Sequence, residues 1–293
     1  MANRASTTAA APPRRTRPWS TRRTAGRLIA WGGLIFVVAW TITPFLVTIT
    51  TSLRTRGAIF SDPSFWPADP TLEAYREVLA RPGFRTSLLN SVILGFGTVT
   101  LTLLLAVPAA YAFARWRFRW RHVLLLFVLL PRLVPGVALL LPLYQLSATL
   151  GVLNRLLTLI VVYTGTLLPL AIWLLAGFFQ QIPRDIEEAA AVDGASLVQR
   201  QWYVVLPLSL PALITIGVLA FREAWNEFQL PLVLATSAES RPLPFELYSL
   251  QDLNLANLPQ EAAFALLTIV PLIFVYLRIE RYVVQGVLTG SGK

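Results

Sequence analysis

Polar and ionisable side chains interrupt the fifth of the chain's long apolar stretches, and they are its first candidates for chemistry. Arg222, Glu223, Asn226 and Glu227 lie near the middle of this stretch, which we expect to be a helix over about residues 208–235. Spacings of three and four place Glu223, Asn226 and Glu227 near one face of that helix. Ionisable groups in apolar surroundings are unfavourable unless they face a partner, a bundle interior or water. We therefore expect these side chains to mark a functional site or a packing network.

Other kinds of chemistry have little support in the sequence. The chain has no cysteine, and His122 is its single histidine, which we expect at a membrane interface rather than in a metal or catalytic site. No His-Glu-x-x-His pattern is present, which argues against an intramembrane enzyme. The ending Gly286–Lys293 resembles a phosphate-binding loop, but its spacing is one residue too long and no Ser or Thr follows the lysine. We expect no nucleotide, metal or catalytic site in this chain.

The composition indicates a membrane protein. Of its 293 residues, 55% are hydrophobic and 14% are charged, whereas soluble domains carry about a quarter of charged residues. Several apolar runs reach the ~20 residues that cross a bilayer as a helix. The net charge of +10 could suggest a nucleic-acid partner, but the arginines cluster beside apolar runs, as between Arg115 and Arg121, where Trp and Phe alternate with them. We expect an all-α polytopic membrane protein that binds no nucleic acid.

The apolar runs predict six transmembrane helices. Their approximate limits are 27–52, 87–113, 122–147, 156–180, 208–235 and 262–279. The third is interrupted by two prolines and a glycine around Arg132, which should bend it and turn Arg132 toward a bundle interior, a partner or water.

The remaining segments complete the predicted layout. Residues 1–26 are rich in Ala, Thr, Pro and Arg and predict a disordered tail. Residues 53–85 predict an ordered external loop, 86–283 the transmembrane core, and 284–293 a short C-terminal tail. The side that holds both termini carries the larger share of Lys and Arg residues, so we expect both termini in the cytoplasm.

The polar segment 181–207 has the signals of a short helical hairpin. Asp185 precedes Glu188 by three residues and predicts a capping box at the start of a first helix. Gly194 suits the turn that follows, where a positive φ is often required. The pair Ser196–Gln199 predicts a second capping box. Such a hairpin of small side chains could press into a groove on another protein.

This segment resembles the EAA loop of ABC importer permeases. The residues that carry the resemblance are Glu188-Ala189-Ala190, Asp193-Gly194-Ala195 and Leu206-Pro207. Other stretches, over roughly residues 25–293, are similar to the carbohydrate (maltose-type) branch: Pro142-Leu143-Tyr144, Leu150 to Asn154, Trp225-Asn226-Glu227-Phe228, and Gly286 with Thr289-Gly290. A second acid, Glu187, precedes the motif, and which of the two acids meets the ATPase stays open.

The resemblance implies a type I importer core and a set of partners. These would be a second homologous permease, a dimer of ATPase subunits that use ATP and Mg, an extracellular solute-binding protein, a sugar (a di- or oligosaccharide) and membrane lipid, in the bacterial inner membrane. The implied ATPase-coupling residues are Glu187, Glu188, Ala189, Ala190, Asp193, Gly194, Ala195, Leu206 and Pro207.

The role of the fifth stretch stays open at this point. Candidates to line a translocation pathway are Arg132, Arg222, Glu223, Trp225, Asn226, Glu227 and Phe228, since aromatic and polar groups together suit sugars. Alternatively, these residues form a salt-bridge network that only fixes packing, or contact the second permease. An ion-coupled secondary transporter using Glu223 or Glu227 is the alternative function, as is an ABC permease for a non-sugar solute. The secondary transporter would usually show inverted repeats and paired broken helices, whereas we find no repeat and one clearly broken span.

Overall fold

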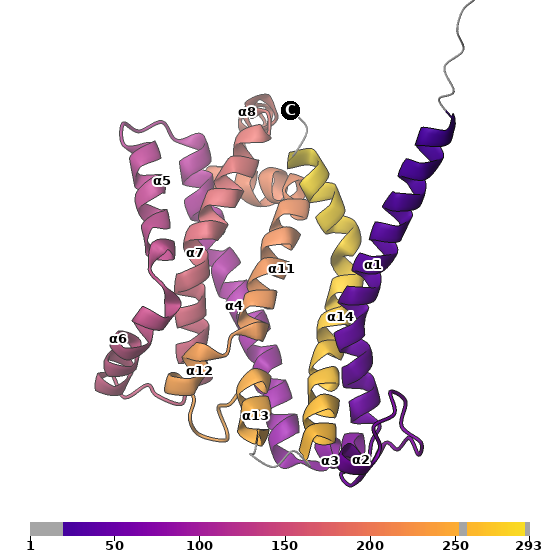
Figure 1. Cartoon of the computed structure of the whole chain (residues 1–293). Coiled ribbons are helices and arrows are strands. Elements are labelled where there is room, and N and C mark those ends of the chain that lie inside the picture. The colour runs from indigo at the N-terminus through magenta and orange to yellow at the C-terminus, as the bar shows by residue number, and fades with distance from the viewer. Residues whose placement is uncertain (1–19, 252–256, 291–293) are drawn as a thin grey trace, which may run out of the picture. The chain divides into compact units, whose positions relative to one another are not determined.

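Helices are the only regular secondary structure in the part of the chain described by the structure, a computed structural model that covers residues 20–251 and 257–290 (Figure 1). Four of them contain stretches long and apolar enough to cross a membrane: α1 (Ser20–Ser52), α4 (Pro82–Arg115), α7 (Leu156–Gln181) and α14 (Leu258–Gly290). Two helix pairs, each bent at a short break, raise this number to as many as six. The predicted all-α polytopic fold is confirmed.

The first structural unit ends at Thr48, and its described part is α1 up to that residue. The window Ile29–Ser52 has a mean hydropathy of 2.0, as expected for the first transmembrane helix. Because α1 begins at Ser20, the prediction of a disordered tail is wrong for residues 20–26. An established helix propagates readily into neighbouring Arg and Ala residues, which favour it. The rest of the predicted tail, residues 1–19, lies outside the described residues.

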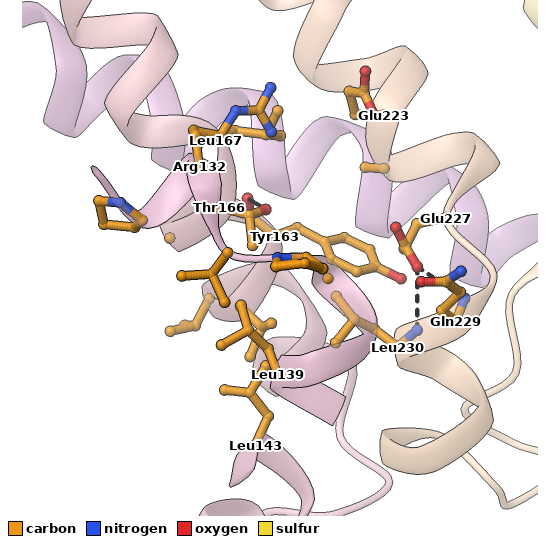
Figure 2. Close-up of a pocket in the computed structure, with 18 of the residues that line it drawn as sticks. Arg132, Leu139, Leu143, Tyr163, Thr166, Leu167, Glu223, Glu227, Gln229 and Leu230 are labelled. Atoms are coloured by element: carbon orange, nitrogen blue, oxygen red, sulfur yellow. Dashed lines mark hydrogen bonds between the residues drawn. The ribbon is translucent and has the colours of Figure 1, made fainter. Parts of the chain in front are cut away.

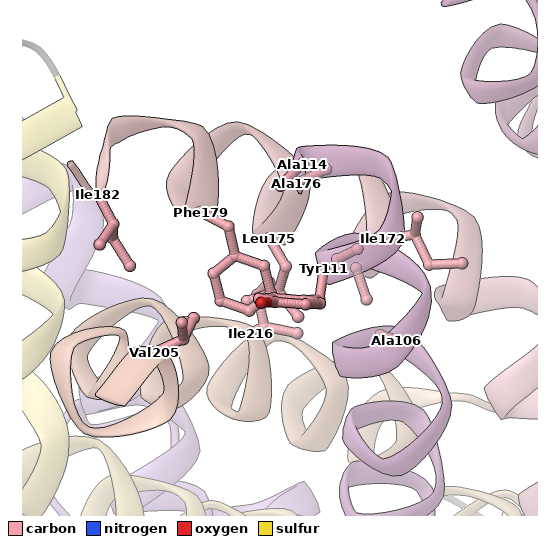
Figure 3. Packing of buried hydrophobic residues seen from close by; sticks show 12 residues of the cluster. Ala106, Tyr111, Ala114, Ile172, Leu175, Ala176, Phe179, Ile182, Val205 and Ile216 are labelled. Carbon is pink, nitrogen blue, oxygen red and sulfur yellow. The ribbon is translucent and has the colours of Figure 1, made fainter. Parts of the chain in front are cut away.

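In the second unit, α4 and α7 form the most extensive helix pair. Ala106, Ala110 and Ala114 recur at every fourth residue of α4, so they share one face, and their small side chains allow a close approach of α7. Leu175 and Phe179 of α7 are fully buried against this face (Figure 3). The resulting cluster fixes the end of α4 that leads to Arg115.

The third predicted span is broken, as its prolines suggested. It consists of α5 (Arg121–Leu129), a 3-10 turn η1 (Leu130–Leu133) and α6 (Gly136–Thr149). The two halves differ in direction by 88°. Pro131 and Pro135 have no N–H to donate, and Pro135 is extended with ψ of 131°, so a helical hydrogen-bond ladder cannot pass this point. Arg132 therefore lies in a turn.

The prediction of one continuous helix over 208–235 is wrong. The segment contains α10 (Leu206–Leu208), α11 (Leu210–Asn226) and α12 (Gln229–Leu234). The chain bends by 79° at Ser209, and α11 ends because Glu227 adopts an extended conformation with ψ of 126°. Glu227 is therefore not on one helical face with Glu223 and Asn226. The described residues thus contain two helix pairs bent at a short break, where the sequence had indicated one clearly broken span.

Short helices connect the spans at the end of the bundle opposite to Arg115. They are α2 (Ala58–Ser61), α3 (Glu73–Ala80) and α13 (Leu243–Leu250). The Ser91 hydroxyl of α4 accepts a 2.8 Å hydrogen bond from the Leu243 N–H, and the Asn90 side chain donates to the carbonyls of Glu239 and Arg241 at 2.8 and 3.0 Å. These bonds join α13 and its preceding loop to α4.

The C-terminal helix is longer than predicted. α14 continues to Gly290, so most of the expected tail over 284–293 is helical, and residues 291–293 lie outside the described part of the chain. The segment 286–290, which resembles a phosphate-binding loop, is thus helical rather than a loop.

Candidate functional site

The polar segment after α7 folds as the predicted hairpin. Its elements are α8 (Arg184–Val192), α9 (Leu197–Arg200) and a π-helical turn η2 (Gln201–Val205) that leads into α10. Gly194 has a φ of +87°, and its N–H bonds to the Ala191 carbonyl while the Ala195 N–H bonds to the Ala190 carbonyl, at 3.1 and 3.0 Å. This paired bonding is a Schellman ending, which favours glycine at the left-handed position. The predicted positive φ of Gly194 in this turn is confirmed.

One of the two predicted caps is present. Ser196 and Gln199 form the reciprocal capping box at the start of α9, with bonds of 3.3 and 2.8 Å. Asp185 does not cap α8, because that helix already begins at Arg184 with Pro183 in the capping position. The prediction of a capping box from Asp185 to Glu188 is therefore wrong. Asp185 lies in the first turn, where a negative charge still favours the helix dipole.

The two adjacent acids of the hairpin have opposite environments. Glu187 is only 5% exposed, and its carboxylate accepts hydrogen bonds from Arg115 Nε at 2.6 Å and from Tyr111 Oη at 2.7 Å. Arg115 also donates to the carbonyl of Ile182 at 3.2 Å. Glu188, by contrast, is exposed. Glu187 thus joins α8 to the end of α4, while Glu188 is free to meet a partner.

The hairpin carries an unusually apolar exposed surface for a polar segment. Val192 is 88% exposed and Tyr203 is 79% exposed, and Val198 and Trp202 are also exposed. Of the sequence-predicted coupling residues, Glu188, Ala189, Asp193, Gly194 and Pro207 are exposed, and Ala190, Ala195 and Leu206 are half-buried. Exposed apolar groups in such a cluster indicate an interface with protein or membrane.

A cavity of about 660 Å³ forms a second candidate site, bordered by the turn at η1, by α6 and α7, and by the break between α11 and α12 (Figure 2). Its polar lining comes from Arg132, Tyr163, Thr166, Glu223, Glu227 and Gln229. Its apolar lining includes Leu139, Leu143, Leu146 and Val161. The turn at η1 and the break between α11 and α12 therefore meet the cavity, and three of the sequence-predicted pathway residues line it.

The other predicted pathway residues lie outside the cavity lining. Trp225 is 1% exposed and stacks on Phe221 with ring centroids 5.3 Å apart, so it belongs to the core. Phe228 packs edge-on against Tyr248 at 5.2 Å. Arg222 is exposed and pairs with Glu223 at 2.8 Å, and Asn226 donates to the Arg222 carbonyl at 2.9 Å.

Three polar lining residues were not found from the sequence: Tyr163, Thr166 and Gln229. Tyr163 is a polar-tipped residue within the apolar helix α7, which is the one signal that could have identified it. The Thr166 hydroxyl donates to the Tyr163 carbonyl at 2.8 Å, so its hydrogen is used within the helix. Gln229 follows a helix break that periodicity did not reveal.

The Glu227 side chain caps the start of α12 at this break. Its Oε1 accepts hydrogen bonds from the N–H groups of Gln229 and Leu230 at 2.8 and 3.1 Å. A carboxylate at the first turn of α12 satisfies N–H groups that have no partner within that helix.

Comparison with known proteins gives a consistent result. The family model of the binding-protein-dependent transport system inner membrane component matches residues 102–289. The trehalose transport system permease protein of Mycobacterium tuberculosis is 31% identical over 92% of this chain and 99% of its own length. The diacetylchitobiose uptake system permease protein of Streptomyces coelicolor is 31% identical over 89% of this chain and 92% of its own.

A solved structure has the same fold. A chain of a bacterial ABC transporter involved in the import of the acidic polysaccharide alginate superposes with a TM-score of 0.80 at 25% identity, over 92% of this chain and 100% of that one. Together with the EAA-type hairpin, the match over more than half of the sequence shows that this chain belongs to the family of binding-protein-dependent transport system inner membrane components, the permease subunits of ABC importers.

Proposed function

We propose that this protein is one permease of an ATP-driven importer that carries a di- or oligosaccharide into the bacterial cytoplasm. The observation that carries the proposal is the hairpin: a glycine-turned pair of helices with exposed apolar and small side chains, joined to α4 through buried Glu187. A hairpin of this kind can receive a displacement from a docked partner and pass it to a transmembrane helix.

The docking partner in this proposal is one subunit of an ATPase dimer. Glu188, Ala189 and Gly194 contact it, because they are exposed and their neighbours are small. Glu187 transmits the movement instead of contacting the ATPase, because its carboxylate is already bound to Arg115 and Tyr111. In this proposal, ATP and Mg are bound by the ATPase subunits.

The remaining partners follow from the family and its relatives. A second permease completes the pathway, and an extracellular binding protein delivers the solute. Relatives named for trehalose and diacetylchitobiose support a sugar as that solute. The excess of Arg and Lys around the hairpin and the termini supports a cytoplasmic position for both.

Co-purification tests the proposal. Wild-type protein solubilised from its native membrane in mild detergent should bring down an ATPase. Gly194→Val should lose it, because a branched side chain at a φ of +87° strains the turn by roughly 1–2 kcal/mol or more. Gly57→Val is the matched control, since Gly57 has a φ of −70° and a Cβ there meets nothing within 4 Å. If the wild type brings down no ATPase, the proposal fails.

A further inference from the structure

The cavity contains a hydroxyl group that none of the described residues satisfies. Tyr163 is 2% exposed, and its Oη has no hydrogen-bond partner among the described residues. Figure 2 shows this hydroxyl directed toward Glu227 and Gln229 at the break between α11 and α12. Buried hydroxyls are nearly always hydrogen-bonded. The missing partner is therefore expected to come from outside the chain, from a ligand that enters the cavity.

The groups around this hydroxyl define the kind of ligand. Glu227 engages backbone N–H groups with Oε1, and its Oε2 has no bond among the described residues, so it can accept a hydrogen bond from a ligand. The side chain of Gln229 adds a donor and an acceptor beside it. A ligand that meets this wall must present several groups that both donate and accept, as sugar hydroxyls do.

The other wall of the cavity is aliphatic. Leu139, Leu143 and Leu146 of α6, with Val161 of α7, line it. Pockets that combine an apolar wall with a few placed polar groups bind ligands that have both kinds of surface. A pyranose ring presents C–H groups on its faces and hydroxyls along its edge, so one sugar unit matches both walls.

The charges of the cavity separate neutral sugars from acidic ones. Two carboxylates, Glu223 and Glu227, face one guanidinium, Arg132, and Glu223 is itself paired with exposed Arg222. Next to the Tyr163 hydroxyl the charged group is the Glu227 carboxylate (Figure 2). A uronate or sulfonate placed there would meet a like charge, which is unfavourable, whereas a neutral hydroxyl would donate to it.

We propose that this cavity is a transit site for a neutral, hydroxyl-rich sugar unit held by Tyr163 Oη and Glu227, and that it discriminates against anionic sugars. The inference rests on the proposed sugar-import function and adds to it that this subunit contacts the sugar directly. The site lies between the turn at η1 and the break between α11 and α12, so a movement of α11 relative to that turn would open or close it.

Removing the single hydroxyl is the first test. Tyr163→Phe, in the importer reconstituted with its second permease, ATPase and sugar-loaded binding protein, should lower sugar uptake per ATP hydrolysed by about threefold to tenfold, the effect of one lost hydrogen bond. The thermal stability of the purified complex should not fall, because that hydroxyl has no hydrogen-bond partner in the part of the chain that the structure describes. Wild-type uptake per ATP in Tyr163→Phe would overturn the inference.

A thiol introduced into the cavity tests the ligand itself. The chain has no cysteine, and a Cβ at either Gly165 or Gly177 of α7 meets nothing within 4 Å. Gly165 lines the cavity and Gly177 does not, so Gly177→Cys is the matched control for Gly165→Cys. A neutral disaccharide should slow methanethiosulfonate labelling of Gly165→Cys alone, and the corresponding disaccharide uronate should not. Equal protection by both sugars, or protection of neither variant, would overturn the inference.

The labelling rate of Gly165→Cys also reports the sign of the charge in the cavity. A charge about 6 Å away, screened as in water, changes the labelling rate of a singly charged reagent about threefold, with opposite sign for cationic and anionic reagents. Glu223→Gln in the Gly165→Cys background should therefore lower the cationic-to-anionic rate ratio by up to about tenfold, and an unchanged ratio would count against the charge selection.

The two levels of proposal fail in different ways. If the wild-type assembly hydrolyses ATP but accumulates no sugar of either kind, the proposed function fails. If it accumulates a neutral sugar while the variants behave like the wild type, only the transit site is refuted.

Discussion

Removal of Glu187 should release the hairpin from α4. In Glu187→Ala the Arg115 guanidinium would remain buried, with its side chain only 9% exposed, and would lose its carboxylate. Removing one member of a buried pair destabilises by about 3–5 kcal/mol. We take about 3 kcal/mol, because the pair lies at the end of a helix where water can reach it after a small movement. At 1.4 kcal/mol per factor of ten, docking of α8 should weaken about 100-fold.

Hydrogen exchange of the assembled importer measures this release. Backbone amides of α8 should exchange about 100-fold faster in Glu187→Ala if they exchange through undocking. Asp185→Ala is the control on the same helix, because Asp185 is exposed and loses at most a helix-dipole contribution. Sugar uptake per ATP should fall in Glu187→Ala as movement of the ATPase ceases to reach α4.

A double variant separates the loss of the pair from the unpaired charge. Glu187→Met combined with Arg115→Met should exchange more slowly than Glu187→Ala, because apolar side chains of similar size often replace a buried ion pair without loss. The reasoning is refuted if the amides of α8 exchange equally fast in Glu187→Ala and Asp185→Ala. It is also refuted if they exchange faster in the double variant than in Glu187→Ala.

Two further predictions concern the packing and pH response of the bundle. Gly95→Ala should destabilise the protein by about 1–3 kcal/mol, because its Cβ would lie 2.6 Å from the Phe221 ring, whereas Gly217→Ala, with its nearest atom at 3.5 Å, should be tolerated in the same thermal-unfolding assay. The hydrogen bond from Gln260, and then the pairing with Arg56, lower the pKa of Glu77. These contacts therefore stabilise the folded protein fully above the ordinary carboxyl pKa near pH 4, and this stabilisation is lost as the pH falls through the lowered pKa. Glu77→Gln should abolish that part of the acid dependence of melting, and an unchanged acid limb would contradict the assignment.

Local chemistry explains what could be read from the sequence. The turn at Gly194 and the box at Ser196 depend on neighbouring residues alone, and both were predicted correctly. The all-α fold with several membrane-spanning helices follows from the length of the apolar runs, and the family from the EAA-type motif. Asp185 was misread as a cap because the helix begins at Arg184, two residues sooner than that cap implies, with Pro183 in the capping position.

Tertiary structure explains the features that could not be predicted from the sequence. The break at Glu227 falls within a stretch whose spacing favours one helix, and the bonds of its carboxylate to the start of α12 support the break. Trp225 has an aromatic side chain of the kind that stacks on sugars, yet it packs against Phe221 and is buried. The separate roles of Glu187 and Glu188 depend on Arg115, which is 72 positions from Glu187 in the chain. The second broken span did not bring support for an ion-coupled carrier, because the relatives are ABC permeases.

α4 has a mechanical consequence that follows from its attachments at both ends. It has 34 residues, which at about 1.5 Å per residue make a rod of about 50 Å, longer than the hydrocarbon core is thick. Near one end Tyr111 and Arg115 hold the hairpin, and near the other Asn90 and Ser91 hold the backbone before and at the start of α13. If one end of this rod is held and the rod tilts by a few degrees, its other end moves by several ångströms. If the hairpin docks onto the proposed ATPase, the same helix would report the nucleotide state of that ATPase to the opposite membrane face.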